Sequence, residues 1–542
     1  MLFGENDVDT MKNRNEIKKR YVLTVIQFAL ILIVLAVFNT GMGQLVPWTQ
    51  VLDFNSLPNS PGDGWAPNAI VISGNAIYGT TFSGNSNVNG DPALLNDGTG
   101  TIYKINTDGT SYIDLHDFSS NTNDLIGANF DGANPWAGLL LCSNILYGTA
   151  RVGGANGNGT IFAIGANGEN FTTIFSFPSE ADDDESGINP KDSLIISSNV
   201  LYGTAENGGA YDCGTVFKVN TDRTGFTDIH DFTDSPGPDA DGTGPTTSLT
   251  LYSNTLYGTT IFGGSGTGQG GGVIFSLNTD GSDYSILHNF TTSNFTGDTN
   301  SDGSNPNCNL TLGSNILYGT TSAGGVYGNG TIYEINPDGT GFATIFSFTN
   351  DSPSGSLTFA NGRLYGVESS GIVNGLFILN TDGTGFVPLN TYDDAGVSLS
   401  SLQVSQNTIY AVGLYSSNNV DIILAINPPQ PVINSIVLNT NGSVTLSCSG
   451  GPYFTYLMQS STDLAPPVAW ETVSTNVADS NGDWQFTDDL PTNLVYGMFT
   501  NYTYSGNFNI NLEATNIITG TNISYGYVPE YPHTFYRIAG PP

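Results

Sequence analysis

Seven copies of one short pattern constrain this chain more than any other feature. Each copy has an apolar residue, then Tyr-Gly or a close variant, then a glycine-rich stretch and a short hydrophobic run that mostly ends in Asn. The tyrosines recur at intervals of 45 to 69 residues, a period typical of repeat architectures in which each copy is one supersecondary unit. The repeated tyrosines are Tyr78, Tyr147, Tyr202, Tyr257, Tyr318, Tyr365 and Tyr410.

The fourth copy shows the unit most clearly. It has four short runs rich in β-branched and aromatic residues, at 248–252, 255–260, 273–278 and 284–290, separated by turn residues such as Ser253-Asn254 and Asp280-Gly281. Such runs predict a four-stranded antiparallel meander in each copy. Because no amphipathic pattern of helical length interrupts the copies, the sequence predicts an all-β fold.

The last copy lacks its fourth run, since Asn427 leads directly into Pro428. A matching run, Val51 to Phe54, stands before the first copy instead. An N-terminal strand that completes the last sheet closes a ring of sheets and removes its exposed edges. The sequence therefore predicts a seven-bladed β-propeller over residues 45–428, closed by an N-terminal strand.

The two ends of the chain differ from the repeats. Alternating runs after Pro429 predict a small β-sandwich of the Ig or fibronectin kind at 429–542, with an insertion at about 491–532. At the N-terminus, basic residues precede the apolar run 21–38, and Gly41 and Gly43 follow it. This layout predicts that residues 1–43 are a signal peptide, or, if uncleaved, a membrane anchor.

The charge of the chain limits its partners. It carries 48 acidic and 12 basic residues, and five of the basic residues precede the apolar run, which leaves seven for the remainder. Such a surface repels phosphates, so we expect no nucleic-acid partner, and membrane contact only through an uncleaved N-terminal segment. The four cysteines follow no spacing pattern, and we expect them to be mostly unpaired.

The repeat resembles a known family. Residues 317–340 contain Leu-Tyr-Gly-Thr-Thr, Gly-Gly, Gly-x-Gly-Thr-Ile-Tyr and Asn-x-Asp-Gly-Thr, and this combination is similar to the GloVer tandem-repeat proteins of bacterial cell surfaces. The tail, with Trp470 and Phe535-Tyr-Arg537, looks like a sandwich domain common beside such arrays. The resemblance implies a secreted or surface protein of the bacterial envelope, and it implies no catalytic residues.

One face of the predicted ring is the candidate binding surface. The connections after the second and fourth strands of each copy are long, whereas those after the first and third are short turns. We call the face with the long connections the long-loop face, and function in rigid scaffolds concentrates on such loops. Trp65 and Trp136 lie beside the prolines of two of these connections. They are the candidate ligand-binding residues, exposed for stacking on sugar rings, or else buried as wedges between blades.

Acidic residues of the same face suggest a metal site. Asp298, Asn300 and Asp302 precede Gly303 and match the first half of a calcium-binding loop, without the closing glutamate. A second acidic pair is Asp239 and Asp241. These five residues are the candidate Ca²⁺ ligands, and the alternative is a solvated polar turn.

Two repeated features have structural explanations. We expect the tyrosines to pack between blades and the glycine after each to let neighbouring backbone approach. His116, His230 and His288 share one repeat position, and since they lie in separate blades we expect a structural role rather than a shared metal.

Three functions remain open. The first is a non-catalytic binding or adhesion module for glycan or another extracellular polymer. The second is a propeller enzyme, a glycan hydrolase or lyase, which would need converging carboxylates or a basic cluster; the inner strands, however, appear apolar in sequence. The third is a structural spacer of the cell envelope.

Overall fold

The computed structural model describes residues 48–54, 65–83, 99–119, 129–178, 186–233, 241–264, 270–291, 299–369, 374–389, 397–405, 408–415 and 420–426 of the repeat region, and, of the tail, 432–438, 444–449, 455–461, 471–477, 483–488, 508–510, 518–519, 522–523 and 535–539. In these residues the chain is all-β, with no α-helix. None of them forms a helix long and apolar enough to cross a membrane, and residues 1–43 lie outside this set.

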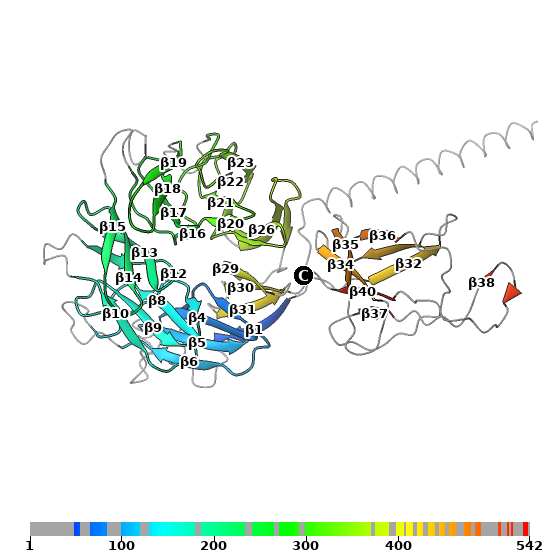
Figure 1. Ribbon diagram of the computed structural model, residues 1–542, viewed down its shortest axis with the longest axis horizontal. Helices are drawn as coiled ribbons and strands as arrows, with labels where there is room; N and C mark the ends of the chain where they lie inside the picture. The colour runs from blue at the N-terminus through cyan, green and yellow to red at the C-terminus, as the bar shows by residue number, and fades with distance from the viewer. Residues whose placement is uncertain are drawn as a thin grey trace, which may run out of the picture.

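Between residues 48 and 426 the described strands form seven antiparallel sheets, which we number 1 to 7 in chain order. Each follows the meander that the sequence predicts, with the first strand of each copy nearest the centre in Figure 1 and the fourth at the periphery. Sheet 1 has β2 (Trp65–Pro67), β3 (Val71–Ser73), β4 (Ala76–Ser83), β5 (Thr101–Asn106) and β6 (Ile113–Asp117). Sheet 2 has β7 (Leu140–Cys142), β8 (Ile145–Ala150), β9 (Thr160–Gly165) and β10 (Thr172–Ser176). Sheet 3 has β11 (Gly187–Pro190), β12 (Ile195–Ser197), β13 (Val200–Gly208), β14 (Thr215–Asn220) and β15 (Thr227–Asp231).

The next three sheets repeat the arrangement. Sheet 4 has β16 (Thr250–Tyr252), β17 (Thr255–Thr260), β18 (Val273–Asn278) and β19 (Ser285–Asn289). Sheet 5 has β20 (Thr311–Gly313), β21 (Ile316–Thr321), β22 (Thr331–Ile335) and β23 (Ala343–Ser347). Sheet 6 has β24 (Ser352–Pro353), β25 (Thr358–Ala360), β26 (Arg363–Ser369), β27 (Asn374–Asn380) and β28 (Val387–Leu389).

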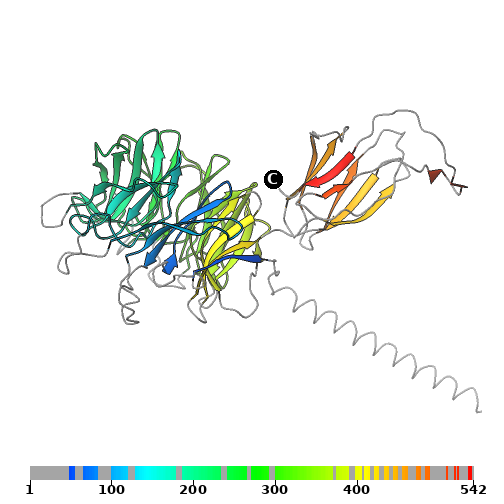
Figure 2. The ribbon, with the colours of Figure 1, turned by 90° about the horizontal axis from the view of Figure 1, so that it is seen from below.

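Sheet 7 takes its strands from both ends of the repeat region. It has β29 (Val397–Ser405), β30 (Thr408–Tyr415) and β31 (Val420–Ile426), and its outer strand is β1 (Trp48–Asp53). β1 pairs antiparallel with β31, with Leu52 opposite Ile423, and Figure 2 shows the blue β1 beside the yellow strands. One hydrophobic cluster joins Leu52 and Phe54 to Tyr410 of sheet 7 and to Ile77 and Tyr103 of sheet 1.

The repeated tyrosines pack between sheets, as the sequence predicts. All seven are buried, with exposed fractions between 1% and 8%. Tyr147 of sheet 2, for example, lies in one cluster with Leu194, Leu201 and Phe217 of sheet 3. Burial of such aromatic rings provides much of the apolar contact between neighbouring sheets.

The glycine after each tyrosine has a different role from the one expected. A Cβ on Gly203 would lie 2.5 Å from Cζ of Phe217, its cross-strand partner in β14. Gly148 and Gly258 have the same relationship to Phe162 and Phe275. The glycine therefore makes room for an aromatic ring of the next strand within the same sheet, not for approaching backbone.

The tail forms two further main sheets. The first has β32 (Val432–Leu438), β33 (Val444–Ser449) and β36 (Asp483–Asp488), and the second has β35 (Glu471–Val477), β34 (Thr455–Ser461), β40 (Phe535–Ala539) and β37 (Phe508–Ile510). β38 (Ile518–Thr519) and β39 (Asn522–Ile523) form a two-stranded ribbon. Most of the expected insertion, 491–532, lies outside the described residues, although β37 to β39 belong to it.

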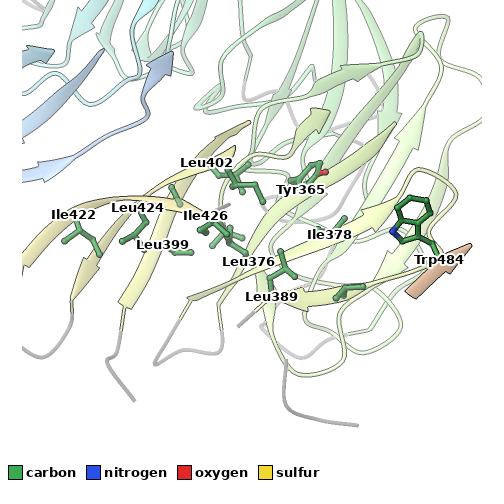
Figure 3. Close-up of a cluster of buried hydrophobic side chains, with 14 of the residues drawn as sticks. Tyr365, Leu376, Ile378, Leu389, Leu399, Leu402, Ile422, Leu424, Ile426 and Trp484 are labelled. Carbon is green, nitrogen blue, oxygen red and sulfur yellow. The ribbon is translucent and has the colours of Figure 1, made fainter. Parts of the chain in front are cut away.

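The tail and the repeats share a hydrophobic cluster. Trp484 of β36 and Cys448 of β33 belong to the same cluster as Leu389 of sheet 6 and Leu399 of sheet 7. Figure 3 shows the Trp484 ring at the edge of this cluster, on the side of Ile378. None of the four cysteines, Cys142, Cys213, Cys308 and Cys448, forms a disulfide.

Candidate functional site: the mouth of a central cavity

The inner strands surround a cavity of about 1040 Å³. Equivalent positions of successive sheets line it, because each long connection passes the cavity before entering its inner strand. The residue directly after the link proline is one of these lining positions in five sheets: Asn68, Trp136, Lys191, Thr246 and Asn307. Three of the five residues are Asn or Thr. Trp136 and Lys191, which belong to neighbouring sheets, are the two lining residues at this repeat position that are neither.

Local hydrogen bonds fix the position of Trp136. The preceding link is held on sheet 1, since Asn134 donates through its backbone N to Thr99 O (2.7 Å) and through Nδ2 to Phe82 O (2.9 Å). Gly100 has φ +92°, and a Cβ there would lie 2.5 Å from Cδ of Pro135. Only glycine allows the proline to lie this close, and the proline in turn directs Trp136 to the cavity mouth.

Trp136 is 43% exposed, which is the exposed one of the two arrangements left open by the sequence. Phe82 meets it edge-on, with ring centroids 4.8 Å apart. Two cations also lie against the ring, Cζ of Arg151 at 5.9 Å and Nζ of Lys191 at 5.8 Å from its centroid. The other predicted ligand residue, Trp65, pairs through its backbone with Ser83, and its side chain lies outside the described residues.

Glu206 of β13 holds the two cations in place. Its Oε1 lies 3.3 Å from Nζ of Lys191, and its Oε2 lies 3.7 Å from a terminal nitrogen of Arg151. Sequence reasoning missed this group, because its members come from separate elements: Arg151 follows β8, Lys191 follows β11, and Glu206 lies within β13. Only the packing of sheet 2 on sheet 3 brings them together.

Asp192 is a second missed residue. Its Oδ2 is buried and has no hydrogen-bond partner among the described residues, and the residue lines the cavity. Burial raises the pKa of this carboxyl well above its usual value, Lys191 opposes the rise, and Glu206 adds to it. Comparison of the copies could have revealed Asp192 in the sequence. The equivalent residues of other copies are Ala137, Thr247 and Cys308, and none of them is charged at neutral pH.

The cavity wall is more polar than the inner strands suggest in sequence. Leu249 and Leu310 do line it, but a belt of hydrogen bonds runs beside them. The backbone N of Ser193 donates to Ser248 Oγ (3.0 Å), that of Ser248 to Asn309 Oδ1 (2.8 Å), and that of Asn309 to Ser356 Oγ (2.9 Å). The apolar pattern seen in the sequence covers only the inner strands themselves, and the polar groups lie just before the inner strands of sheets 3 to 6.

The acidic residues of the long-loop face hold the links together. Oδ2 of Asp302 accepts from Thr291 N (3.0 Å) and lies 3.1 Å from Nε2 of His288. Oδ1 of Asn300 accepts from Gly303 N (2.8 Å) and Gly325 N (2.7 Å). Asn300 also donates to Thr291 O and Gly303 O, so its whole amide is engaged by backbone.

The same link recurs earlier in the chain. Oδ2 of Asp131 accepts from Ser119 N (3.0 Å) and lies 3.1 Å from Nε2 of His116, while Oδ1 of Asn129 accepts from Gly132 N and Gly154 N. The segment 300–303 is therefore a repeat-specific Asn-x-Asp-Gly link, a more ordered structure than the solvated turn considered from sequence. Asp241 is bonded to His230 and Thr233 in the same way.

The calcium prediction stays a prediction. Asp239 and Asp298 lie outside the described residues, and within the described ranges no three His, Cys, Asp or Glu side chains gather as metal ligands. Oδ1 of Asp302 is the one atom of the three described candidate residues that is buried without a hydrogen-bond partner in those ranges.

The three repeated histidines have the structural role expected of them. Each is bonded to an aspartate and stacked on an aromatic ring of the next sheet, His116 on Phe171 with ring centroids 3.7 Å apart. His230 and His288 stack in the same manner on Tyr284 and Phe342.

The exposed aromatic side chains favour one face. Among the described residues the aromatic rings with large exposure are Phe130, Trp136, Tyr211 and Tyr327, and all four belong to connections of the long-loop face. The opposite face exposes only the aliphatic Ile113 and Ile145 among large apolar residues of the described part. Exposed aromatic groups on one face are typical of an interaction surface.

Comparison with known proteins adds a family and several distant structures. A family model described as the Gloeobacter/Verrucomicrobia repeat matches residues 44–266 and again residues 237–425. No curated protein matches the chain.

The solved structures that resemble the chain do so weakly. A chain of a nidogen/laminin complex is 14% identical over 53% of this chain and 89% of its own, with a TM-score of 0.32. YCF48 from Cyanidioschyzon merolae is 11% identical over 70% of this chain and 98% of its own, with a TM-score of 0.42. The extracellular domain of BT4673 from B. thetaiotaomicron is 11% identical over 87% of this chain and 58% of its own, with a TM-score of 0.44. Each of these TM-scores lies below 0.5.

Proposed function

Because the chain belongs to the Gloeobacter/Verrucomicrobia repeat family, we propose that it is an exported seven-bladed β-propeller that binds an extracellular polysaccharide without catalysis. The closed ring is supported by the pairing of β1 with β31 and by the hydrophobic cluster shared between sheets 7 and 1. The tail would be a sandwich domain that follows the propeller, and the mature chain would lie on the cell surface or be secreted.

The exposed ring of Trp136 at the cavity mouth carries this proposal. A flat aromatic ring packs against the apolar face of a pyranose. Hydroxyl and amide groups of the protein can then form hydrogen bonds with the hydroxyl groups around the edge of the sugar ring. The chain provides both, since Trp136 lies above a wall that includes Ser193, Ser248 and Asn309. Nucleic acid is a poor candidate, because the net charge of −36 repels phosphates.

The test is binding of the full chain to an array of bacterial, algal and plant polysaccharides. We expect binding that Trp136→Ala weakens about tenfold or more, as loss of a central aromatic contact does. Ile145→Ala is the matched control, because Ile145 is 37% exposed on the opposite face. Trp65→Ala tests the other ring predicted from sequence.

Two outcomes would overturn the proposal. If no polysaccharide binds, the spacer interpretation gains. If Trp136→Ala and Ile145→Ala bind as well as the unaltered chain, the cavity mouth is not the site.

A glycan-cleaving enzyme is a second candidate, favoured by one observation. Asp192 offers a carboxyl with a raised pKa inside the cavity, as a general acid would. Incubation with each bound polysaccharide and analysis of chain length decides between the two: shortening that Asp192→Asn abolishes identifies an enzyme, and unchanged length leaves a binding module.

Calcium binding and export are proposals with their own tests. If Asp302 binds Ca²⁺, calorimetric titration of the chain gives heat that Asp302→Asn removes. Absence of heat with the unaltered chain ends that idea. If residues 1–43 are a signal peptide, N-terminal sequencing of the exported form begins after residue 43, whereas a mature chain that retains Tyr21 shows an anchor.

A further inference from the structure

Two of the few cations of this chain meet at the cavity mouth. Only seven basic residues follow residue 38, against a large excess of acidic ones, and two of the seven lie on the ring of Trp136. The others in the described repeats are Lys104 of sheet 1, Lys218 and Arg223 of sheet 3, and Arg363 of sheet 6. The cavity mouth therefore combines two cations in a chain in which acidic residues predominate.

The local charge balance leaves a positive excess. Arg151 and Lys191 share the single carboxylate of Glu206. The remaining nearby carboxyl, Asp192, is buried, and burial raises its pKa, which weakens it as a counter-charge. One positive charge thus has no full partner at the mouth.

Both cations are partly exposed to solvent. The side chain of Arg151 is 38% exposed and that of Lys191 is 27% exposed. Each lies within 6 Å of the Trp136 centroid, so a pyranose stacked on the ring has both within reach of its substituents. Guanidinium and ammonium groups in such positions bind carboxylates by charge-assisted hydrogen bonds.

We infer that the polysaccharide bound at Trp136 is acidic, a polymer of carboxylate-bearing sugars. A uronate residue stacks on Trp136 and its carboxylate bonds to Lys191 and Arg151, replacing water at the positive excess. The acidic remainder of the chain repels an acidic polymer. The cations at the cavity mouth therefore favour an acidic ligand and also determine where on the chain it binds. This inference rests on the proposed binding function.

The test compares each acidic glycan with its neutral counterpart. The probes are oligosaccharides of galacturonate, glucuronate, mannuronate and guluronate, and the same oligosaccharides after carboxyl reduction, titrated into the full chain by calorimetry. We expect at least one uronate to bind about tenfold or more tightly than its reduced form, and added salt to weaken it.

Three variants separate charge from folding. Lys191→Gln and Arg151→Gln remove a cation and are expected to bring the affinities of the acidic and reduced forms together. Glu206→Gln removes the counter-charge, so it is expected to tighten the uronate several-fold, an effect that a damaged fold does not produce. Thermal unfolding of each variant checks the fold independently.

The outcomes distinguish the inference from the function beneath it. If reduced oligosaccharides bind as tightly as uronates, the acidic preference is wrong and the binding function stands. If neither form of any probe binds and the wider array is also negative, both fail. Uronate binding that Lys191→Gln and Arg151→Gln leave unchanged also overturns the inference.

Discussion

The Nε2 atom of His116 lies 3.1 Å from Oδ2 of Asp131, and this pair joins the outer strand of sheet 1 to the link that leads into sheet 2. The same pair recurs as His230 with Asp241 and as His288 with Asp302. Where the histidine is replaced by Phe175, the aspartate is replaced by Ser186, and Phe175 stacks on Phe226 at 3.6 Å instead. The two positions thus change together from copy to copy.

This covariation predicts a double-mutant result. Asp131→Ser alone leaves His116 without its acceptor and is expected to lower the free energy of unfolding by about 1–3 kcal/mol. Adding His116→Phe reproduces the arrangement of the next copy and is expected to restore most of that loss. Urea unfolding at pH 7 measures both, and a double variant no more stable than the single one would contradict the explanation.

The contribution of the His116–Asp131 pair to stability should depend on pH. Burial opposes ionisation of Asp131, but hydrogen bonds from His116 and Ser119 outweigh it, and the pKa falls below the ordinary 3.8. A lowered pKa stabilises the fold above the ordinary value, and the contribution disappears as pH falls through the lower, folded-state pKa. The unaltered chain is therefore expected to lose more stability than the double variant below about pH 4. Melting temperatures from pH 7 to pH 2 provide the comparison.

The close contact between each of these glycines and the aromatic ring of the next strand predicts that no larger residue fits at the glycine position. Gly203→Ala places a methyl group 2.5 Å from Cζ of Phe217 and is expected to destabilise by about 1–3 kcal/mol. Gly375→Ala is the control, because its nearest neighbour, Cγ of Glu368, lies 3.6 Å away. Phe217→Leu should partly rescue Gly203→Ala, since sheet 7 pairs Ala411 with Leu424 at the same place. Equal losses from the two glycine substitutions would refute the steric explanation.

Glu368 predicts an opposite pH effect. Burial, with a smaller contribution from Asp351, raises the pKa of this carboxyl to about 7. The protonated form is thus favoured in the folded state, so the contribution to stability is full below the ordinary pKa of 4.5 and is lost as pH rises through about 7. Glu368→Gln keeps the neutral form and is expected to raise the melting temperature at pH 8.5 relative to the unaltered chain, with a smaller difference at pH 4.5. A difference independent of pH would show that Glu368 does not titrate in this way.

β1 predicts a coupling between the two ends of the repeat region. Leu52 is 6% exposed and clusters with Tyr410 and Ile423. Leu52→Asp buries a charge there and is expected to destabilise by several kcal/mol. Hydrogen exchange should then become faster in both β31 and β3, because they lie on either side of this cluster. Unchanged protection of β31 would mean that β1 does not hold sheet 7.

Much of the fold could be predicted because it is local and repeated. The alternation of apolar runs and turn residues determines each meander, and two-residue turns such as Ser143-Asn144 have the positive φ values, 50° and 65°, that favour Asn at such positions. The partner of each glycine was also visible, since an aromatic residue stands at a fixed place in the third strand of six copies. We expected backbone at that place because the facing residue depends on strand register, which spacing alone does not determine.

The site was predictable only in part. Trp136 stood out in the sequence because it lies beside the proline of a long connection, but whether its ring is exposed or buried could not be decided there. Arg151 and Glu206 gave no such signal, because their meeting depends on how one sheet packs on the next. The aspartates were interpreted as metal ligands because their spacing suits calcium, and that interpretation stays a prediction. The contact of Asp302 with His288 was missed, although comparing the copies, in which His and Asp-Gly occur together, would have pointed to that pair.

The pairing of β1 with β31 imposes an order on biosynthesis. β1, the first strand of the described residues, finds its partner only after more than 360 further residues have been made. Until then sheet 7 has an open edge and β1 has nothing to bind. Contacts this distant along the chain slow folding, so the nascent protein needs protection from aggregation for the whole of its synthesis.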